Sequence, residues 1–279
     1  MHGQQSSFSF FAVAPVAAAP APAAGPALKW AGGKRWLLPH LRPLWQPFAA
    51  HRLVEPFVGG MAVALGLQPA RALLADSNEH LINFYRWLQR GLVVEGPMAN
   101  EETAFYAART RFNALARQGG QWSEEAAGLF YYLNRTCFNG LCRFNGKNEF
   151  NVPFGRYKTI NYTTDFTPYR ATLGSWHIEH QDFAQTPLTA NDFLYADPPY
   201  DTPFSRYGKD DFTWDDQLRL AHWLAQAPGP VVTTNQATPR ILDLYAGAGF
   251  RIETLLAPRR IASSGDRTPA LEMLATRNI

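Results

Sequence analysis

The spacing of apolar residues predicts strands that alternate with helices over most of the chain. Short apolar runs bounded by turn residues are typical of buried strands, and such runs occupy residues 51–57, 73–76, 178–179, 193–196, 231–234 and 250–255. Helical patterns occupy residues 36–44, 62–67 and 240–245. This alternation favours an α/β fold in which helices cover a mostly parallel sheet.

A helical block interrupts the alternation. Between residues 78 and 118 the apolar positions recur with the helical period, and a further helix is predicted from Ser123, an N-cap residue followed by two acids, to about residue 132. We interpret this block as an inserted domain. The predicted organisation is a tail at residues 1–27, a sheet domain from residues 28–80 and 170–279, and an insert at residues 81–169.

Composition narrows the class of protein. The chain has 279 residues, 46% of them hydrophobic, which is enough for one large or two small globular domains. A net charge of +3 permits a nucleic-acid partner without requiring one. The two cysteines are too few for a disulfide scaffold and favour a reducing, cytoplasmic compartment.

No apolar run approaches the roughly 20 residues that span a bilayer, so no membrane association is expected. Residues 6–26 superficially resemble a signal peptide. However, they contain no Lys or Arg before Lys29 and are interrupted by prolines. A flexible Ala/Pro-rich tail is the better interpretation.

A glycine turn and an acidic residue suggest a nucleotide-like ligand. Gly59 and Gly60 follow the strand at residues 51–57, and Asp76 ends the next strand, where an acid accepts hydrogen bonds from ribose hydroxyls. The full dinucleotide pattern G-x-G-x-x-G is absent, because Met61 stands where a glycine is expected. A cofactor without a pyrophosphate, such as S-adenosylmethionine, needs fewer glycines.

Two other glycine pairs are less specific. Gly32 and Gly33, flanked by lysines and Trp30, either let the backbone approach a small ligand or form an ordinary turn before a helix. Gly247 and Gly249 follow a helical pattern and are interpreted as a helix C-cap before a strand.

The most informative stretch is FLYADPPY at residues 193–200. Two prolines end a buried strand and leave the Asp197 carboxylate and bare backbone carbonyls beside the Tyr200 ring. These acceptors suit an aromatic substrate with an amino group, such as adenine, whose amine becomes nucleophilic when both of its hydrogens are bound. A proline-rich turn after an ordinary core strand remains the alternative.

Residues 134–158 combine five basic residues with one acid, Glu149, and interleave aromatics with asparagines and glycines. Basic residues contact phosphates, Arg and Asn read purine edges, and an aromatic fills the gap left by an extruded base. We favour contact with duplex DNA, although a loop-rich satellite core explains the aromatics equally well. A zinc site built from Cys137, Cys142, His177 and His180 is disfavoured by the spacing, and no metal is predicted.

Several motifs occur together in a characteristic order: WAGGK at residues 30–34, EPFVG at 55–59, Asp76, the segment 134–157, and DPPY at 197–200. With them, residues 28–277 resemble the Dam family of DNA adenine-N6 methyltransferases of the D12 class. The resemblance implies a Rossmann-like class I methyltransferase sheet that binds S-adenosylmethionine, with an inserted, mainly helical DNA-recognition domain. It also implies methylation in GATC, a nucleoid-associated enzyme and no obligatory protein partner.

The resemblance assigns roles to individual positions. Those implied to bind the cofactor are Trp30, Lys34, Phe57, Gly59, Asp76, Asp182 and Phe183. Those implied to act in catalysis are Asp197, Pro198 and Tyr200. Those implied to contact DNA are Phe138, Asn139, Leu141, Arg143, Pro153 and Arg156. Two departures from the family pattern are Met61 in the glycine motif and Phe138, where a Tyr is common.

Two other functions compete with this interpretation. A methyltransferase for RNA or a protein amide also uses a Pro-Pro-Tyr turn, but usually after Asn, and the basic segment argues against it. A DNA-binding regulator with a dead catalytic site is disfavoured by the intact residues 197–200.

Overall fold

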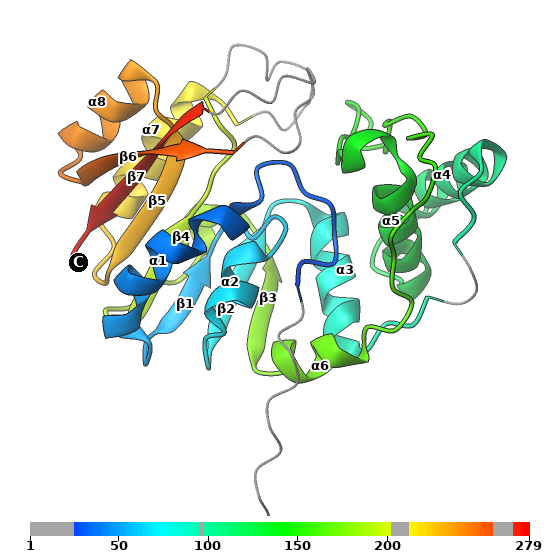
Figure 1. Cartoon of the computed structure of the whole chain (residues 1–279), viewed down its shortest axis with the longest axis horizontal. Coiled ribbons are helices and arrows are strands. Elements are labelled where there is room, and N and C mark those ends of the chain that lie inside the picture. The colour runs from blue at the N-terminus through cyan, green and yellow to red at the C-terminus, as the bar shows by residue number, and fades with distance from the viewer. Residues whose placement is uncertain (1–24, 95–97, 202–211, 259–269) are drawn as a thin grey trace, which may run out of the picture.

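The computed structural model describes residues 25–94, 98–201, 212–258 and 270–279. They contain a seven-stranded sheet in the order β3-β2-β1-β4-β5-β7-β6 (Figure 1). The strands are β1 (Arg52–Glu55), β2 (Ala72–Asp76), β3 (Trp176–His180), β4 (Asp192–Ala196), β5 (Val231–Gln236), β6 (Arg251–Ala257) and β7 (Ala270–Arg277). The tail was expected at residues 1–27, and its residues 1–24 lie outside the described residues.

The strand order reverses between β1 and β4. The chain runs outward from β1 through β2 to β3, then returns to β4 on the other side of β1, and all these neighbours are parallel. In open α/β sheets, ligands bind outside the carboxyl ends of the strands at such a reversal. Therefore the loops that follow β1 and β4 are the first place to look for a site.

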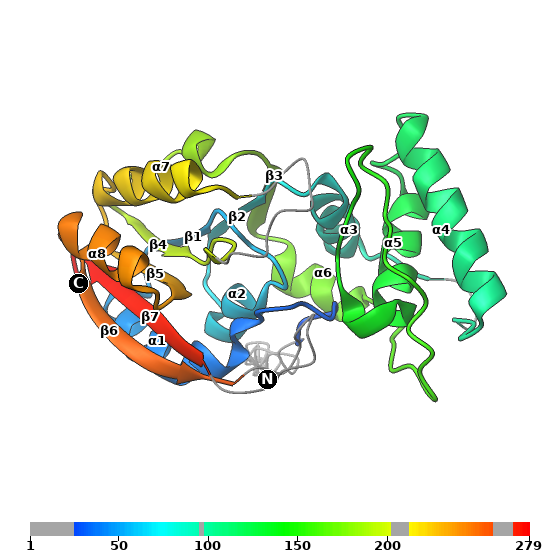
Figure 2. The same ribbon diagram turned by 90° about the horizontal axis from the view of Figure 1, so that it is seen from above.

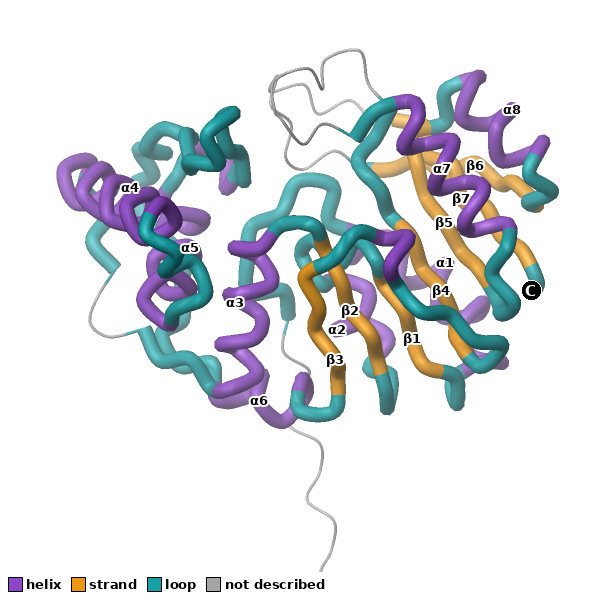
Figure 3. Tube along the Cα trace, turned by 180° about the vertical axis from the view of Figure 1, so that it is seen from behind, coloured by secondary structure: helices purple, strands orange, loops and turns teal. Residues whose placement is uncertain are grey.

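Helices cover both faces of the sheet (Figures 2 and 3). The helices α1 (Leu38–Trp45) and α2 (Ala62–Leu67) lie on one face, and α7 (Trp214–Ala225) and α8 (Pro239–Gly247) lie on the other. Strand residues alternate accordingly, so that Leu53 belongs to the core under α1 and Val54 to the core under α7. None of the described helices is long and apolar enough to cross a membrane.

The helical block lies beyond the β3 edge of the sheet (Figure 1). It consists of α3 (Glu79–Arg90), α4 (Glu102–Arg117) and α5 (Glu124–Thr136), followed by the single turn η3 (Phe138–Gly140) and by α6 (Thr167–Leu173). Helix α3 joins the two parts, because Arg86 Nε donates to the Ile178 carbonyl of β3 at 2.9 Å while Phe84 stacks on Tyr131 of α5. The expected domain boundaries at residues 80/81 and 169/170 fall inside α3 and α6.

Most predicted elements are present, with one difference. The periodic stretch from residue 78 to 118 forms two helices before the one at Ser123, as expected, and α3 ends at Gly91, which adopts a left-handed conformation with φ of 88°. Strand β7 was not predicted, because the acid Glu272 interrupts its apolar pattern. The Ser123 N-cap is confirmed by a bond from Ala126 N at 3.2 Å, and Gly249 follows the end of α8 with φ of 78° as expected.

Candidate active site

The predicted catalytic and cofactor-binding residues gather at the carboxyl ends of β1, β2, β3 and β4 and on the segment around residues 30–34. The segment before the short helix η1 (Lys34–Leu37) arches over this edge of the sheet (Figure 1). Because β1 and β4 are neighbours, the Gly59 turn and the Asp197 turn leave the sheet side by side. The sheet thereby brings together motifs that lie far apart in the sequence.

Only one of the two carboxylate oxygens of Asp197 contacts the described residues that hold it in place. Its Oδ1 forms an ion pair with Lys34 Nζ at 2.9 Å and accepts from Thr234 Oγ1 of β5 at 3.0 Å. The Thr234 hydroxyl also lies 3.1 Å from the hydroxyl of Tyr195 on β4. No residue that the structure describes donates a hydrogen bond to Asp197 Oδ2. The carboxylate is therefore fixed in position but keeps one oxygen for a ligand.

The two prolines differ in their partners. The Pro199 carbonyl accepts from Gln217 Nε2 at 2.9 Å, and Gln217 is held in turn by Asn235 of β5 at 3.0 Å. Among the described residues, none donates to the Pro198 carbonyl. The adjacent turn thus presents two acceptors without a described donor, Asp197 Oδ2 and the Pro198 oxygen.

Tyr200 is anchored to the same lysine. Lys34 Nζ donates to the Tyr200 hydroxyl at 2.9 Å and lies 5.0 Å from the centre of the ring. Burial, followed by the charges of Asp197 and Glu272, raises the pKa of Tyr200 well above its ordinary value. The phenol is therefore neutral, and its hydroxyl is free to accept from the ammonium.

Two further buried acids adjoin this group. Glu272 Oε1 on β7 lies 3.2 Å from Lys34 Nζ, and Glu55 at the end of β1 is only 2% exposed, with Oε1 unpaired. Burial raises the pKa of Glu55 well above its ordinary value, because a buried carboxyl group is disfavoured in its charged form. Burial also raises the pKa of Glu272, against the opposing effect of Lys34.

The predicted cofactor turn is tightly built. Gly59 N donates to Asp76 Oδ2 at 3.1 Å, and Asn78 N donates to Asp76 Oδ1 at 3.0 Å. Trp30 packs on the turn so closely that a Cβ on Gly59 would lie 2.7 Å from its indole nitrogen. Tyr85 of α3 fixes the same turn from the other side by donating to the Gly59 carbonyl at 2.6 Å. Only glycine fits at this position.

An aromatic group lies next to the turn. The rings of Phe57 and Phe183 are 5.5 Å apart, and Phe183 is buried at the start of the short helix η4 (Phe183–Gln185). Asp182 caps this helix through Ala184 N and accepts from the two terminal guanidinium nitrogens of Arg219, at 2.7 and 2.9 Å. The Arg219 pairing lowers the pKa of Asp182.

These features fit an adenosine-containing cofactor. The Asp76 carboxylate can still accept hydroxyl hydrogens, the glycine turn leaves room for close approach, and the Phe57 and Phe183 rings offer an apolar surface for a base. Trp30 and Lys34 lie on the segment that covers the turn. All the residues implied to bind the cofactor are thus near one edge of the sheet.

The six predicted DNA-contact positions form a separate group after α5. Phe138 is 43% exposed, and Asn139 beside it adopts a left-handed conformation with φ of 53°. Arg143 and Arg156 are also exposed, but each has a partner: Asn151 Oδ1 at 2.7 Å for Arg143 and Glu102 at 3.3 Å for Arg156. Pro153 is exposed and Leu141 is half-buried.

The other aromatics of the basic segment belong to a core. Phe150 is 2% exposed and packs edge-on against Phe112 of α4, while Phe144 and Phe154 are partly buried against the same cluster. The satellite-core interpretation is therefore correct for these residues. Phe138 is the described phenylalanine of this segment that faces solvent.

Asn134 ties the insert to the segment before Lys34. Its side-chain oxygen accepts from Lys29 N at 2.9 Å, and its amide nitrogen donates to the Lys29 carbonyl at 2.8 Å. The same nitrogen lies 3.3 Å from the Gly140 carbonyl, and a Cβ at Gly140 would collide with the Lys29 side chain. The predicted recognition loop and the predicted cofactor segment therefore share one buried amide.

Comparison with known proteins decides the family. A family model described as D12 class N6 adenine-specific DNA methyltransferase matches residues 30–259. The chain belongs to this family. It is 34% identical to the Retron Ec67 DNA adenine methylase of Escherichia coli, over 89% of this chain and 90% of that protein. Identity to the DNA adenine methylase of Escherichia coli K12 is 33%, over 89% and 93% of the two chains.

A third relative is longer. The DNA N-6-adenine-methyltransferase of Escherichia phage P1 is 36% identical over 85% of this chain, but this chain spans only 33% of that protein. The expected resemblance, the Rossmann-like methyltransferase sheet and the class of enzyme, an adenine-specific DNA methyltransferase, are confirmed. The residue roles stay predictions.

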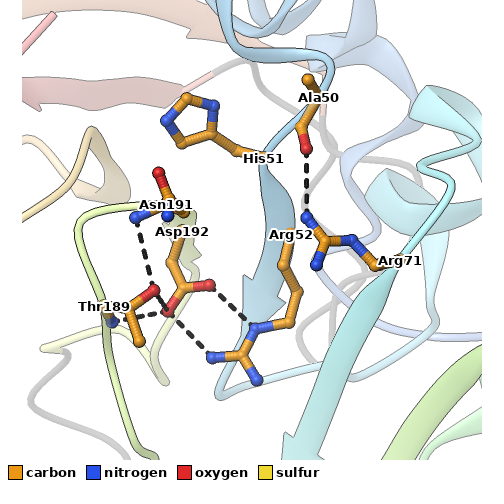
Figure 4. Close-up of a pocket in the computed structure, with 7 residues that line it drawn as sticks. All are labelled: Ala50, His51, Arg52, Arg71, Thr189, Asn191 and Asp192. Carbon is orange, nitrogen blue, oxygen red and sulfur yellow. Dashed lines mark hydrogen bonds and ion pairs between the residues drawn. The ribbon is translucent and has the colours of Figure 1, made fainter.

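A pocket elsewhere on this methyltransferase is unrelated to that site (Figure 4). This cavity of about 380 Å³ lies at the amino ends of β1 and β4 and is lined by Arg52, Arg71 and Asp192 among others. Arg52 and Asp192 are already paired by two bonds of 2.8 Å, and Arg71 donates to the Ala50 carbonyl at 3.3 Å. We place the site at the opposite edge, where the D12 motifs converge.

Sequence reasoning missed several residues of the site. Thr234 and Gln217 hold Asp197 and Pro199, and Glu272 approaches Lys34, yet none was singled out. The available signal was a polar residue in an apolar pattern: Thr234 ends a predicted strand, and Glu272 interrupts the apolar run at residues 270–275. Such residues are typical of strands whose ends line a site.

Proposed function

We propose that this enzyme transfers a methyl group from S-adenosylmethionine to N6 of an adenine flipped out of duplex DNA, with GATC as the target. The observation that carries the proposal is the pair of acceptors at the end of β4, Asp197 Oδ2 and the Pro198 carbonyl, beside a glycine turn that fits an adenosine cofactor. A DNA substrate also implies a nucleoid-associated enzyme in the cytoplasm.

The two acceptors can activate the amine. The N6 lone pair of adenine is delocalised into the ring, so the free amine is a poor nucleophile. If Asp197 and the Pro198 carbonyl each accept one amino hydrogen, the nitrogen is drawn toward a tetrahedral geometry and its lone pair is exposed. The Tyr200 ring, which Lys34 anchors, supports the base by stacking. Catalysis then depends mainly on positioning.

When bound, S-adenosylmethionine supplies an electrophilic methyl group. Asp76 would accept from the ribose, and Phe57, Asp182 and Phe183 would contact the adenine ring; the adjacent positions of the glycine turn and the two phenylalanine rings support this assignment. As N6 gains the methyl group, it loses a proton that has become acidic. Asp197 therefore needs no raised basicity to accept it.

The insert at residues 81–169 is proposed to recognise DNA. Flipping a base costs a few kcal/mol, and the exposed ring of Phe138 is suited to fill the space that the adenine leaves. Arg143 and Arg156 are exposed and can exchange their present partners for bases or phosphates. This assignment keeps substrate recognition and chemistry on separate elements.

The deciding experiment measures labelled methyl transfer from S-adenosylmethionine to two duplexes that differ only in GATC versus GTAC. We expect transfer to GATC alone. Equal transfer to both duplexes would refute the target but keep the chemistry. Transfer to neither, with an adenine-rich duplex of mixed sequence also inactive, would refute the proposed function.

A further inference from the structure

We propose that Glu272 is a positioning residue of the methyl-transfer site: it shares the Lys34 ammonium with Asp197 and so keeps the Asp197 carboxylate a strong acceptor for the target amine. This inference rests on the proposed function. Glu272 lies on β7, outside every sequence motif that indicated the site. It is not among the residues to which the family resemblance assigned a role.

Lys34 has more acceptors than hydrogens. Its side chain is only 4% exposed, and four oxygens lie within 3.2 Å of Nζ, whereas an ammonium has three hydrogens. They belong to Gly32, Asp197, Tyr200 and Glu272, at 3.0, 2.9, 2.9 and 3.2 Å. Glu272 Oε1 is the most distant of the four oxygens and has no hydrogen-bond partner among the described residues. Glu272 therefore acts on Lys34 through charge.

The charges of Lys34, Asp197 and Glu272 indicate what Glu272 contributes to the site. Lys34 lies between the carboxylates of Asp197 and Glu272, so these three side chains together have two acidic groups for one basic group. Without Glu272, Lys34 and Asp197 would form a neutral one-to-one pair. The ammonium would then offset the Asp197 charge in a buried site, where such effects are strong. Sharing the lysine preserves negative charge where N6 becomes positive.

The ionisable groups that face Lys34 and Glu272 within the described residues come from three elements. They are Glu55 on β1, Tyr195, Asp197 and Tyr200 on β4 and the turn after it, and Glu272 itself on β7. Strand β5 contributes the neutral Thr234. Burial lowers the pKa of Lys34, but Asp197 and Glu272 outweigh burial and raise it.

The proposed role of Glu272 predicts a change in the pH dependence of methyl transfer. Removing the negative charge of Glu272 makes its neighbours lose their protons more readily, so the pH profile of the chemical step should move to lower pH. A side chain that only fills space would leave the profile in place. The signature therefore separates an electrostatic role from a structural one.

The test compares Glu272→Gln, Glu272→Asp and the wild type in single-turnover methyl transfer to a GATC duplex over a range of pH. Glu253→Gln on the adjacent strand β6 is the matched control, because that side chain is 55% exposed. Calorimetry measures S-adenosylmethionine binding for each variant, and thermal unfolding confirms that each folds.

We expect Glu272→Gln to slow transfer by about 10- to 100-fold at neutral pH, with cofactor affinity nearly unchanged and the profile moved to lower pH. Glu272→Asp should recover part of the rate with an unshifted profile, because it keeps the charge at a longer distance. Glu253→Gln should match the wild type.

The inference is overturned if Glu272→Gln keeps the wild-type rate and profile. It is also overturned if cofactor affinity falls as much as the rate, since that result indicates a binding role. If Glu272→Gln does not fold, Glu272→Asp decides, and wild-type kinetics in that variant would refute the inference. A wild type that methylates no duplex would overturn the proposed function as well.

Discussion

The proposed catalytic edge of the sheet and the proposed recognition loop after α5 hold their charged groups in opposite ways. At the sheet, Lys34 is 4% exposed and has two carboxylate partners within 3.2 Å. In the loop, the Arg156 side chain is 76% exposed and its one carboxylate partner, Glu102, lies at 3.3 Å. Arg143 is likewise exposed and bonded to a neutral amide.

The difference follows from what each region has to do. Buried charges with several fixed partners hold one geometry, and removing one partner is costly because the others remain in a dry site. Exposed pairs are worth about 0–1 kcal/mol, so DNA can replace them at little cost. In the proposed function, chemistry therefore depends on a few fixed atoms, whereas the exposed arginines are able to change partners when DNA binds.

The largest effect should come from the buried region. We expect Asp197→Ala to reduce single-turnover methyl transfer by about 1000-fold or more, because it removes an acceptor that positions the amine. Cofactor affinity should change little, since Asp76 and the glycine turn remain. Calorimetry and labelled transfer measure the two quantities, with Asp243→Ala on the exposed face of α8 as the control. Near-normal turnover would refute the mechanism.

A second prediction concerns the joint between the two regions. His80 at the start of α3 is 2% exposed; its ring stacks on Phe144, with centres 4.9 Å apart, and packs at a tilt against Phe112, with centres 4.8 Å apart. Burial lowers the pKa of His80 to about 4, from an ordinary value near 6.5. The unfolded chain therefore takes up a proton first as the pH falls. Stability present above pH 6.5 should be lost as the pH drops toward 4, by about 3 kcal/mol.

Urea unfolding at neutral and acidic pH tests this expectation. The variant His80→Phe keeps an aromatic ring in the stack but cannot titrate, so its stability should fall less on acidification than that of the wild type. The control is His40→Gln on the exposed face of α1. An equal loss in His80→Phe and the wild type would show that His80 is not the group responsible.

The smallest effect should come from the recognition loop. If Arg143 reads a guanine, Arg143→Ala should cost about 1–3 kcal/mol and relax selection at that base pair only. Methyl transfer to duplexes with single substitutions in GATC measures this, and Arg156→Ala is tested in the same way. Arg111→Ala, which breaks an exposed pair with Glu125 between α4 and α5, is the control. A uniform loss on every duplex would instead indicate a phosphate contact.

The features that the sequence predicted well have local causes. The turn at residues 197–200 follows from two prolines, and the turn at Gly59 from a strand, two glycines and a helix in succession. Ser123 and Gly249 mark helix ends by their own chemistry. Each signal lies within a few residues of the feature it predicts.

The features that were missed depend on contacts between distant segments. Strand β7 lies last in the chain but inserts between β5 and β6, and only that placement brings Glu272 to Lys34. The partition of aromatics is similar: nothing near Phe150 distinguishes it from Phe138, yet one is buried against α4 and the other faces solvent. The packing of distant segments determines both the position of β7 and the burial of these aromatic residues. A short stretch of sequence carries no information about that packing.

The contacts of Asn134 affect how the insert can be exchanged between related methyltransferases. The oxygen and the nitrogen of its side-chain amide both make hydrogen bonds to the backbone of Lys29. Lys29 lies well before the insert in the sequence, and β1, α2 and β2 separate the two. A hybrid enzyme that received only residues 81–169 from a relative would meet a foreign partner at this joint. We expect hybrids with altered target sequence to work best when residues 25–34 are transplanted together with the insert.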